Sequence, residues 1–519
     1  MIKNSSTPSP TTTTTSEEIP LTYVSSSDRK YDVTIFGATG FTGTLIVRYL
    51  IQRLERMDSV VNSRRFCIAG RNESKLNNLV TAHNINMSEK GLHHLIIDVM
   101  VIEKIEKGSP KLLDLTRNTK VLLNVAGPFI ACGGLEIVES CVETRTDYLD
   151  ITGEPEFVLE SAAKFHEKAK ENHVKIIHCC GFDSIPSDLG TNISLNMIKK
   201  KLEDVGVLSH MTSHNTVLSQ SSSSSTPETI ISTNGYLAFN LPGFVSYGTF
   251  NTLVTSLENY SIFSGKKTNE QQVQKMTKKK SYSKRGTKYH TGLQHYIIPF
   301  STSDPLIVRR SNFLIGYESK FSSNPTPPPT SSNPSSSSDR VFEYNNYLQI
   351  SNLYYLFLMY LFFLVMLIMT RFSFGAQFLR FLYSLKKNPT QQQRDESSFD
   401  FVFETFGRVQ DATTSEPVLF KCKTRVFNNN DPGYTETAVY ALDSALFLLT
   451  NPHAQTASPG VVTPGAVFGV ESCGDEYLKC LGQHTTLKYD FVEFKYVKAS
   501  NKKEYEELKK EVSQFLKLD

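Results

Sequence analysis

The sequence of 519 residues predicts an α/β protein whose first domain is a doubly wound parallel sheet of the Rossmann type. Three observations support this fold class. Short apolar runs alternate with helical patterns between positions 31 and 200, the first run ends in a glycine-rich turn, and a basic residue follows the second run. Such alternation is typical of a parallel sheet, because each parallel strand needs a crossover helix to reach the next one.

The first apolar run, residues 33–36, leads into the sequence GATGFTG, and a helical pattern follows it. The N–H groups of such a turn, together with the helix dipole, attract the pyrophosphate of a dinucleotide. The spacing is G-x-x-G-x-x-G rather than the commoner G-x-G-x-x-G, but the flanking strand and helix that the motif requires are both present. We therefore predict a dinucleotide site formed by Gly37, Ala38, Thr39, Gly40, Phe41, Thr42 and Gly43.

The second strand, residues 65–70, is followed by Arg71. An acidic residue at this place binds the ribose 2′-hydroxyl of NAD, whereas an arginine suits the 2′-phosphate of NADP. The sequence therefore predicts NADP as the cofactor, with NAD as the alternative. Asp98 closes a third apolar run over residues 95–98, and we predict it beside the adenine or, alternatively, at a helix N-cap.

The fourth strand is residues 121–125. In this fold its C-terminal end faces the nicotinamide side of the ligand-binding crevice at the C-terminal edge of the sheet. Ala126 and Gly127 follow it, and we predict that both approach the cofactor closely. A fifth strand over residues 148–151 and a sixth over residues 174–179 complete the pattern, each preceded by a helical segment.

Three side chains near these strand ends are candidates for the proton donor that many reductions require: Tyr148, Asp150 and Asp183. Each has a structural alternative, because Tyr148 can pack in the core, Asp150 can cap the turn at Thr152, and Asp183 can fix the turn before Pro186. The cysteines and histidines show no spacing typical of a metal site, so no metal is predicted.

Five motifs, GATGFTG, AGR, NVAGPF, YLDITGE and GFDSIPSDLG, occur in this order within residues 31–200. Together they resemble the saccharopine dehydrogenase-like oxidoreductases, a family related to the trans-acting enoyl reductases of bacterial lipid synthesis. The resemblance continues more weakly in DPGYTETAVYALDSALFLL and TPGAVFG near the C-terminal end. It implies a Rossmann fold and NAD(P)-linked oxidoreductase chemistry, but not a role in lysine metabolism, since the substrate half of the chain diverges.

The remaining sequence predicts a second α+β domain with a mixed sheet over residues 201–519. Residues 399–409, 418–426 and 485–497 alternate as strands do, and residues 435–449 have helical spacing. Ser/Thr/Pro-rich segments at 1–30, 219–227, 322–338 and 388–398 predict a disordered tail, without a secretory signal, and three disordered loops. The exposed face of the second domain offers a surface for a homodimer.

Residues 353–370 form an apolar segment without a charged side chain, and an amphipathic stretch follows at residues 372–387. Three alternatives stay open: a buried core helix, a single membrane span, and an interfacial or hairpin-like insertion. If the chain on both sides forms one enzyme, the insertion is favoured over the span. A basic run at residues 275–288 is expected to be a solvated face, a nuclear-localisation signal or, beside the apolar insertion, a patch that attracts anionic lipid headgroups.

The net charge of +3 is too small to favour nucleic acid, and eight cysteines without a C-x-x-C pair indicate reduced thiols inside the cell. We expect an NADP-dependent oxidoreductase that transfers hydride between nicotinamide and a C=O, C=C or C=N group of a lipid-like or amino-acid-like substrate. We expect it at the cytosolic face of a membrane or lipid droplet. The alternatives are a catalytically silent NAD(P)-binding scaffold on such a surface and a true saccharopine-forming dehydrogenase.

Overall fold

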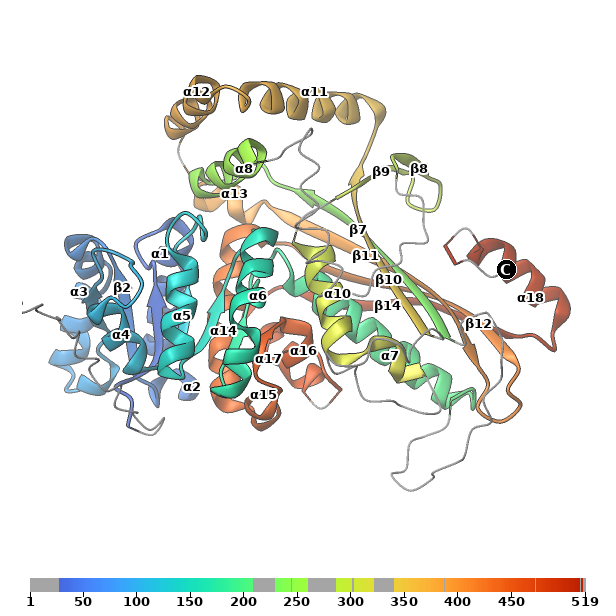
Figure 1. The fold of residues 1–519 in the computed structure, drawn as a ribbon, viewed down its shortest axis with the longest axis horizontal. Coiled ribbons are helices and arrows are strands. Elements are labelled where there is room, and N and C mark those ends of the chain that lie inside the picture. The colour runs from blue at the N-terminus through green and yellow to red at the C-terminus, as the bar shows by residue number, and fades with distance from the viewer. Residues whose placement is uncertain are drawn as a thin grey trace, which may run out of the picture.

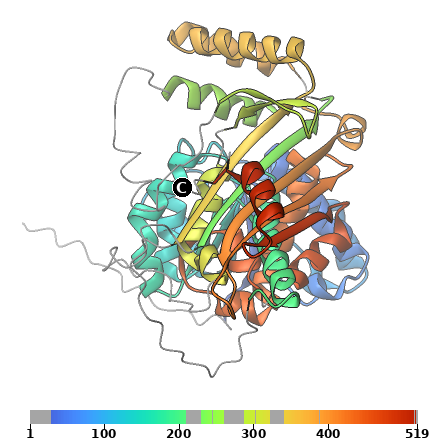
Figure 2. The ribbon, with the colours of Figure 1, turned by 90° about the vertical axis from the view of Figure 1, so that its right-hand side faces the viewer.

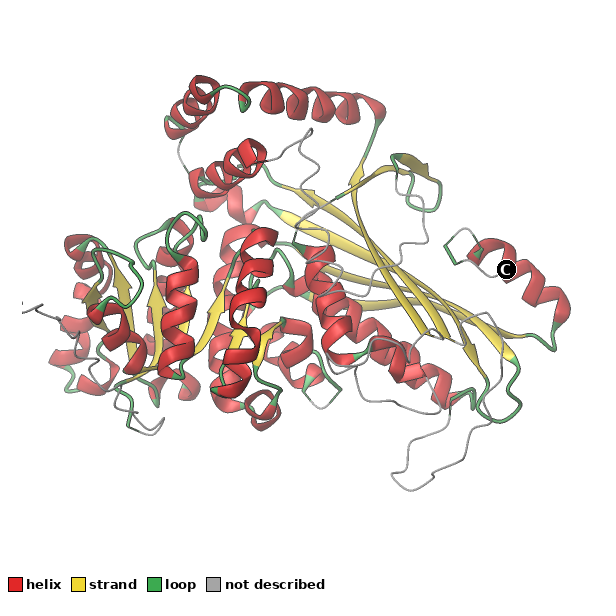
Figure 3. Cartoon of the chain, viewed as in Figure 1, coloured by secondary structure: helices red, strands yellow, loops and turns green. Residues whose placement is uncertain are grey.

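The computed structural model describes residues 28–208, 229–243, 245–259, 286–300, 303–321, 340–386, 388–471, 473–513 and 515–516. Two seven-stranded sheets, each covered by helices, lie side by side along the long axis of the molecule (Figures 1 and 3). Residues 1–27, the expected loops 219–227 and 322–338, and most of the basic run lie outside the described residues.

The first sheet, here called sheet A, is parallel throughout, with the strand order β13-β6-β5-β4-β1-β2-β3. Its strands match the runs predicted from the sequence within a few residues, except for β3 and the added strand β13. They are β1 (Tyr31–Phe36), β2 (Phe66–Gly70), β3 (Asp98–Val101), β4 (Thr119–Asn124), β5 (Asp147–Asp150), β6 (Lys175–Ile177) and β13 (Gly460–Val462).

Helices cover both faces of sheet A, which confirms the doubly wound fold class. One face packs against α1 (Phe41–Glu55), α2 (Ser59–Asn62), α3 (Glu73–Glu89), α14 (Thr437–Thr450), α15 (Pro452–Thr456), α16 (Pro464–Phe468) and α17 (Gly474–His484). The other face packs against α4 (Pro110–Arg117), α5 (Gly134–Thr144) and α6 (Pro155–Glu171).

Sheet A is completed by the C-terminal part of the chain. The helical pattern at residues 435–449, which the sequence placed in the second domain, becomes α14 and packs on sheet A beside α1. The placement in the second domain is therefore wrong. A buried ion pair between Arg53 of α1 and Asp443 of α14 explains the new position, and the Tyr49 hydroxyl also donates to Asp443, at 3.2 Å. Strand β13 then adds to the free edge of β6.

The second sheet, sheet B, has the order β14-β12-β11-β7-β10-β9-β8 and is mixed, because β7 and β10 are parallel while the other pairs are antiparallel. This confirms the mixed sheet expected for the second half. Its strands are β7 (Thr229–Asn240), β8 (Lys288–His290), β9 (His295–Pro299), β10 (Arg340–Ile350), β11 (Ser398–Gln410), β12 (Pro417–Asn428) and β14 (Lys488–Lys498).

Helices α7 (Gly190–Asp204) and α10 (Asp304–Ile315) pack on one face of sheet B, and α18 (Lys502–Val512) packs on the other. The short turns η2 (Ile185–Leu189) and η4 (Pro432–Glu436) lead directly into α7 and α14. The predicted disorder at residues 388–398 is wrong. This segment forms α13 (Gln391–Asp395), because Thr390 and Gln393 close a capping box, and β11 begins at Ser398.

Helices α11 (Leu353–Met369) and α12 (Ser373–Ser384) form an outer layer beyond α8 (Tyr247–Asn259), away from both sheets (Figures 1 and 2). We call α11 and α12 the apolar layer. The alternative of a buried core helix is wrong, because twelve of the 17 residues in α11 are large apolar side chains exposed at the surface. Among the described helices, none has the length and hydropathy that crossing a membrane requires.

Candidate dinucleotide crevice

The glycine turn between β1 and α1 has a backbone that only glycine can form. Gly37 has φ +88°, and a Cβ there would lie 2.7 Å from the backbone nitrogen of Ala126. A Cβ on Gly43 would lie 2.4 Å from the carbonyl oxygen of Gly37. These two glycines therefore let α1 and the loop after β4 approach the turn closely.

The N-terminus of α1 is left open for an anion. Gly40 is its N-cap and provides no side-chain cap, and the first turn contains no acidic residue. Because the first N–H groups of a helix have no acceptor within the helix, they attract a phosphate. The geometry fits the predicted pyrophosphate position along Gly37–Gly43, and the roles of Ala38, Thr39, Phe41 and Thr42 in it stay predictions.

Arg71 directly follows β2, at the C-terminal edge of sheet A, and its side chain is exposed. The Arg71 guanidinium lies near Cys132, in the loop that precedes α5. Burial raises the pKa of the Cys132 thiol, and the positive charge of Arg71 is close enough to oppose this rise. Arg71 is therefore an exposed cation at the edge where an adenosine 2′-phosphate is expected in this fold.

Asp98 lies at the wrong end of its strand for the predicted contact with adenine. It begins β3 rather than closing it, and its carboxylate binds Lys30 at 2.8 Å and accepts a hydrogen bond from the Tyr31 hydroxyl at 3.0 Å. Since ligands of parallel sheets bind at the C-terminal edge, the assignment of Asp98 to the cofactor site is wrong.

Two side chains that sequence reasoning missed hold the loop after β4. The Asn124 carbonyl accepts a hydrogen bond from the Ala126 backbone N–H at 3.0 Å. The Glu154 carboxylate accepts from the N–H groups of Phe129 at 2.7 Å and Ile130 at 3.1 Å. Both residues lie inside the motifs NVAGPF and YLDITGE, which was the available signal. They position the predicted nicotinamide loop around Ala126 and Gly127.

Tyr148 does not have the environment of a proton donor. Its side chain is fully buried in the core under α5 and α6, and its hydroxyl accepts a hydrogen bond from the Asn124 amide at 3.0 Å. Burial raises the pKa of Tyr148 well above its ordinary value, the opposite of what acid catalysis requires. The structure therefore favours the packing alternative for Tyr148.

Asp150 is also sealed in the core. Its carboxylate accepts hydrogen bonds from the backbone N–H groups of Thr152 at 3.1 Å and Cys179 at 3.0 Å, and His178 Nδ1 lies 2.6 Å away. His178 Nε2 in turn lies 2.8 Å from the Ser161 hydroxyl. This Ser–His–Asp series resembles the arrangement in a hydrolase, but all three side chains are fully buried, so no substrate reaches them. Asp150 ties β5 to β6.

Asp183, by contrast, reaches solvent just beyond β6. Its Oδ2 would lie 2.7 Å from a Cβ placed on Gly153, so the carboxylate stands directly beside the loop that follows β5. No hydrogen bond or ion pair within the described part of the chain holds it. The surrounding protein atoms raise the pKa of its carboxyl to about 6 by desolvation. Asp183 is therefore an unpaired acid at the C-terminal edge of sheet A.

The second half of the molecule covers this edge. The Thr437 hydroxyl at the start of α14 accepts a hydrogen bond from the Phe182 N–H at 3.0 Å, and the Phe182 ring lies 5.0 Å from that of Phe399 in β11. The Tyr434 ring of η4 meets the Phe41 ring at the start of α1, with centroids 5.0 Å apart. Residues from both sheets therefore surround the space between the glycine turn and Asp183.

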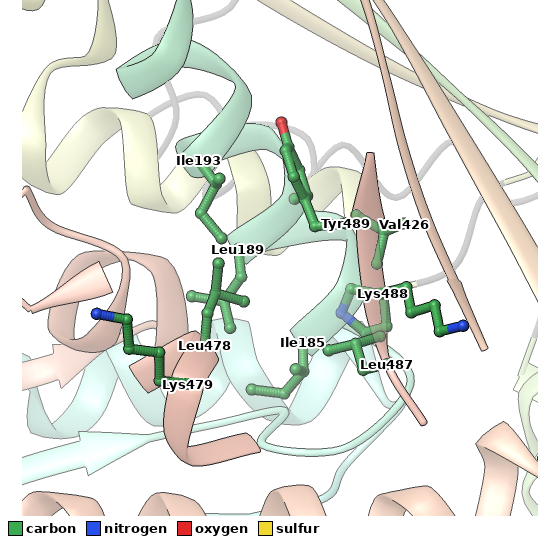
Figure 4. Close-up of a pocket in the computed structure, with 11 residues that line it drawn as sticks. Ile185, Leu189, Ile193, Val426, Leu478, Lys479, Leu487, Lys488 and Tyr489 are labelled. Atoms are coloured by element: carbon green, nitrogen blue, oxygen red, sulfur yellow. The ribbon is translucent and has the colours of Figure 1, made fainter. Parts of the chain in front are cut away.

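A separate apolar cavity of about 200 Å³ lies between η2, the start of α7, α17 and the start of β14 (Figure 4). Ile185, Leu189, Leu478 and Leu487 provide much of its wall. Neither the glycine turn nor Asp183 contributes to its lining, so this cavity is distinct from the dinucleotide crevice.

Comparison with known proteins agrees with this geometry. Residues 33–177 match the family described as saccharopine dehydrogenase NADP binding domain. The chain is 27% identical over 457 residues to a saccharopine dehydrogenase-like oxidoreductase of Rattus norvegicus, covering 86% of this chain and 94% of the relative. It is 27% identical to a lipid droplet localized protein of Caenorhabditis elegans, covering 89% of this chain and 99% of the relative.

A Mycobacterium tuberculosis relative, whose name provisionally places it among the trans-acting enoyl reductases, is 30% identical over 166 residues. That match covers 32% of this chain and 36% of the relative. These findings confirm the resemblance predicted from the sequence, the NADP-binding domain, and the class of NAD(P)-dependent oxidoreductases.

Proposed function

We propose that this NADP-binding oxidoreductase reduces a C=O, C=C or C=N group of a lipid-like substrate, at a lipid surface, with Asp183 as the proton donor. One observation carries the chemistry: an unpaired, solvent-reaching carboxyl stands at the edge of sheet A where the nicotinamide is expected. Bound NADPH supplies the hydride for such a reduction. A carboxyl with a pKa of about 6 keeps a useful protonated fraction near neutral pH and gives its proton to the other atom of the reduced bond.

The other residues of the crevice bind and position. The glycine turn and the open N-terminus of α1 take the pyrophosphate, and Arg71 takes the 2′-phosphate. Asn124 and Glu154 hold the loop after β4 through its backbone N–H groups, so that Gly127 lies against the nicotinamide side. The Ser246 N–H donates to the Tyr434 hydroxyl and so anchors the Tyr434 side chain, whose ring packs edge-on against Phe41.

The apolar layer supports the lipid surface. Helix α12 turns its cation inward, because Arg380 donates to the Glu258 carboxylate of α8 at 2.5 Å and to the Asn251 carbonyl at 2.8 Å. Its outward face carries large apolar side chains at helical spacing: Phe374, Phe378, Phe381, Leu382 and Leu385. Large exposed apolar patches mark interaction sites. A lipid surface can bind such an apolar helix face without a matching shape or charge.

The chain connections favour an in-plane position for this layer. Helix α11 follows β10, and α12 returns through α13 to β11, so both ends of the insertion join the same sheet. Such an insertion lies in the surface of a bilayer or droplet without crossing it. The name of the Caenorhabditis elegans relative supports a lipid droplet in particular. We propose the cytosolic face of such a surface, while a homodimer stays a prediction.

The test is NADPH oxidation by the full chain in phosphatidylcholine vesicles, over a panel of long-chain ketones, 2-enals, imines and saccharopine. We expect turnover of a lipid member, and we expect Asp183→Asn to lower kcat by at least about a hundredfold while NADPH binding stays unchanged. Glu156→Gln, an acidic residue on the nearby helix α6, is the matched control. NADPH binding without turnover across the panel would replace the reductase with a silent cofactor-binding scaffold, and turnover of saccharopine alone would indicate the amino-acid substrate.

A further inference from the structure

Two exposed aromatic side chains lie on the segment that joins β7 to α8. Phe239 is 41% exposed near the end of β7, and Tyr247 is 40% exposed at the start of α8. Single exposed apolar residues are common on protein surfaces and need no explanation. These two differ because the segment between them connects the crevice to the apolar layer. We call the described residues 239–243 and 245–247 the aromatic bridge.

One end of the aromatic bridge reaches the crevice. Phe239 lies directly opposite Phe399 in the antiparallel pair of β7 and β11, so both side chains are on one face of sheet B. The Phe399 ring lies 5.0 Å from that of Phe182, the residue immediately before Asp183. Phe239 therefore lies on the same face of sheet B as the ring that contacts Phe182, one residue before the proposed proton donor.

The other end of the bridge reaches the apolar layer. The Tyr383 hydroxyl of α12 donates to the Val245 carbonyl at 2.7 Å, and the Tyr383 ring stacks on Phe250 of α8, with centroids 3.8 Å apart. Tyr247 is close enough to Arg380 of α12 for its hydroxyl to influence the pKa of the guanidinium. The bridge thus runs from α12 to the face of sheet B that packs against Phe182.

We infer that the aromatic bridge is the path by which substrate passes from the lipid surface to Asp183, an inference that rests on the proposed function. A lipid in a surface layer has its polar end outward and its chain inside, so the polar end leaves the layer first. The chain then trails over Tyr247 and Phe239, which shield it from water. The reducible group must therefore lie within the first few carbons of the polar end.

This reasoning assigns the substrate class: a long-chain lipid with a ketone, or a double bond conjugated to a carbonyl, next to its polar end. In the ketone reaction the hydride of NADPH forms the new C–H bond at the carbonyl carbon. The carbonyl oxygen takes the proton of Asp183, and the products are an alcohol and NADP⁺. A proton from the solvent then restores the Asp183 carboxyl, so that each turnover consumes one NADPH and one H⁺.

The experiment uses the full chain with NADP⁺ and phosphatidylcholine vesicles that contain methyl 3-oxohexadecanoate with a diazirine at mid-chain. After irradiation, peptide mapping should place cross-links on the aromatic bridge. Cross-links confined to α11 and α12 would overturn the path, because they would show docking without transfer. Cross-links on the bridge without NADPH-dependent turnover of the ester would refute the reductase function and leave the path intact.

A kinetic comparison with NADPH separates the path from folding defects. Phe239→Ala should lower kcat/KM for vesicle-borne methyl 3-oxohexadecanoate by about tenfold and leave that for water-soluble methyl acetoacetate unchanged. Ile85→Ala, which removes an exposed apolar side chain on the outer helix α3, should change neither value. Equal rates of the wild type and Phe239→Ala on the vesicle-borne ester would overturn the inference.

Discussion

Removal of two outward phenylalanines from α12 should detach the protein from lipid without unfolding it. Phe374 is 77% exposed and Phe381 is 60% exposed, so neither side chain contributes much to the folded core. Full burial of a phenylalanine side chain is worth about 1.5–3 kcal/mol, and these exposed fractions correspond to about 1–2 kcal/mol for each ring that enters lipid. The double change Phe374→Ala with Phe381→Ala should therefore weaken binding by about 2–4 kcal/mol, or between about one and three orders of magnitude.

The measurement is flotation of purified protein with phosphatidylcholine vesicles and with triolein droplets coated by the same lipid. NADPH binding, followed by nicotinamide fluorescence, and the midpoint of thermal unfolding serve as controls for the fold. Val492→Ala, which shortens an exposed side chain on β14, should float like the wild type. Equal flotation of the double variant and the wild type would refute the assignment of α12 as the lipid-binding face.

Three further changes test the crevice and the buried acids. Arg71→Ala should weaken NADPH binding by about 10- to 100-fold and leave NADH binding unchanged in a fluorescence titration, because a charged hydrogen bond to the 2′-phosphate is lost; equal losses for both would contradict its role. Gly43→Ala should abolish binding of both nucleotides, since the new Cβ would lie 2.4 Å from the Gly37 carbonyl, whereas Gly482→Ala, with open space around its Cβ, should bind normally; retained binding in Gly43→Ala would contradict the turn geometry. Burial raises the pKa of Asp188 to about 7, so between about pH 4 and pH 7 the folded protein holds a proton that the unfolded chain releases. The free energy of unfolding should therefore fall as pH rises through this window, by up to about 1.4 kcal/mol per pH unit. In thermal unfolding scans, Asp188→Asn should reduce this dependence of stability on pH; the same dependence in the variant and the wild type would contradict the raised pKa of Asp188.

The glycine turn and the parallel strands of sheet A could be predicted because their signals are local. A run of apolar residues, three glycines and a helical pattern stand next to one another in the chain, and each favours the same conformation. The capping box at Thr390 also has a local signal, because Gln393 stands three residues later. The polar residues around it favoured the incorrect prediction of disorder.

The error at Asp98 has a specific physical cause. Residues 95–97 are apolar, and Leu95 and Ile97 are buried as strand residues would be. However, the Asn84 side-chain amide of α3 donates to the Ile97 carbonyl and accepts from the Ile97 N–H, at 2.9 Å each. A side chain therefore satisfies the backbone groups that a strand partner would otherwise satisfy, and β3 begins one residue later.

The catalytic candidates could not be separated by sequence. Tyr148, Asp150 and Asp183 all stand near strand ends, and their difference lies in burial, which depends on helices distant in the chain. Only the folded arrangement shows that Asp150 is enclosed by Thr152, His178 and Cys179 while Asp183 reaches solvent. The placement of α14 is of the same kind, because its partner Arg53 lies 390 residues away.

The pairing of Arg53 with Asp443 has a consequence for the order in which the chain acquires its structure during synthesis. Ribosomes release the first six strands of sheet A long before α14 and β13 exist. Until then Arg53 is paired with Asp58 alone, and the apolar surface of α1 and the edge of β6, which α14 and β13 later cover, remain in contact with water. The nascent N-terminal half should therefore depend on chaperones, and the nucleotide-binding domain should become competent only after the C-terminal segment leaves the ribosome.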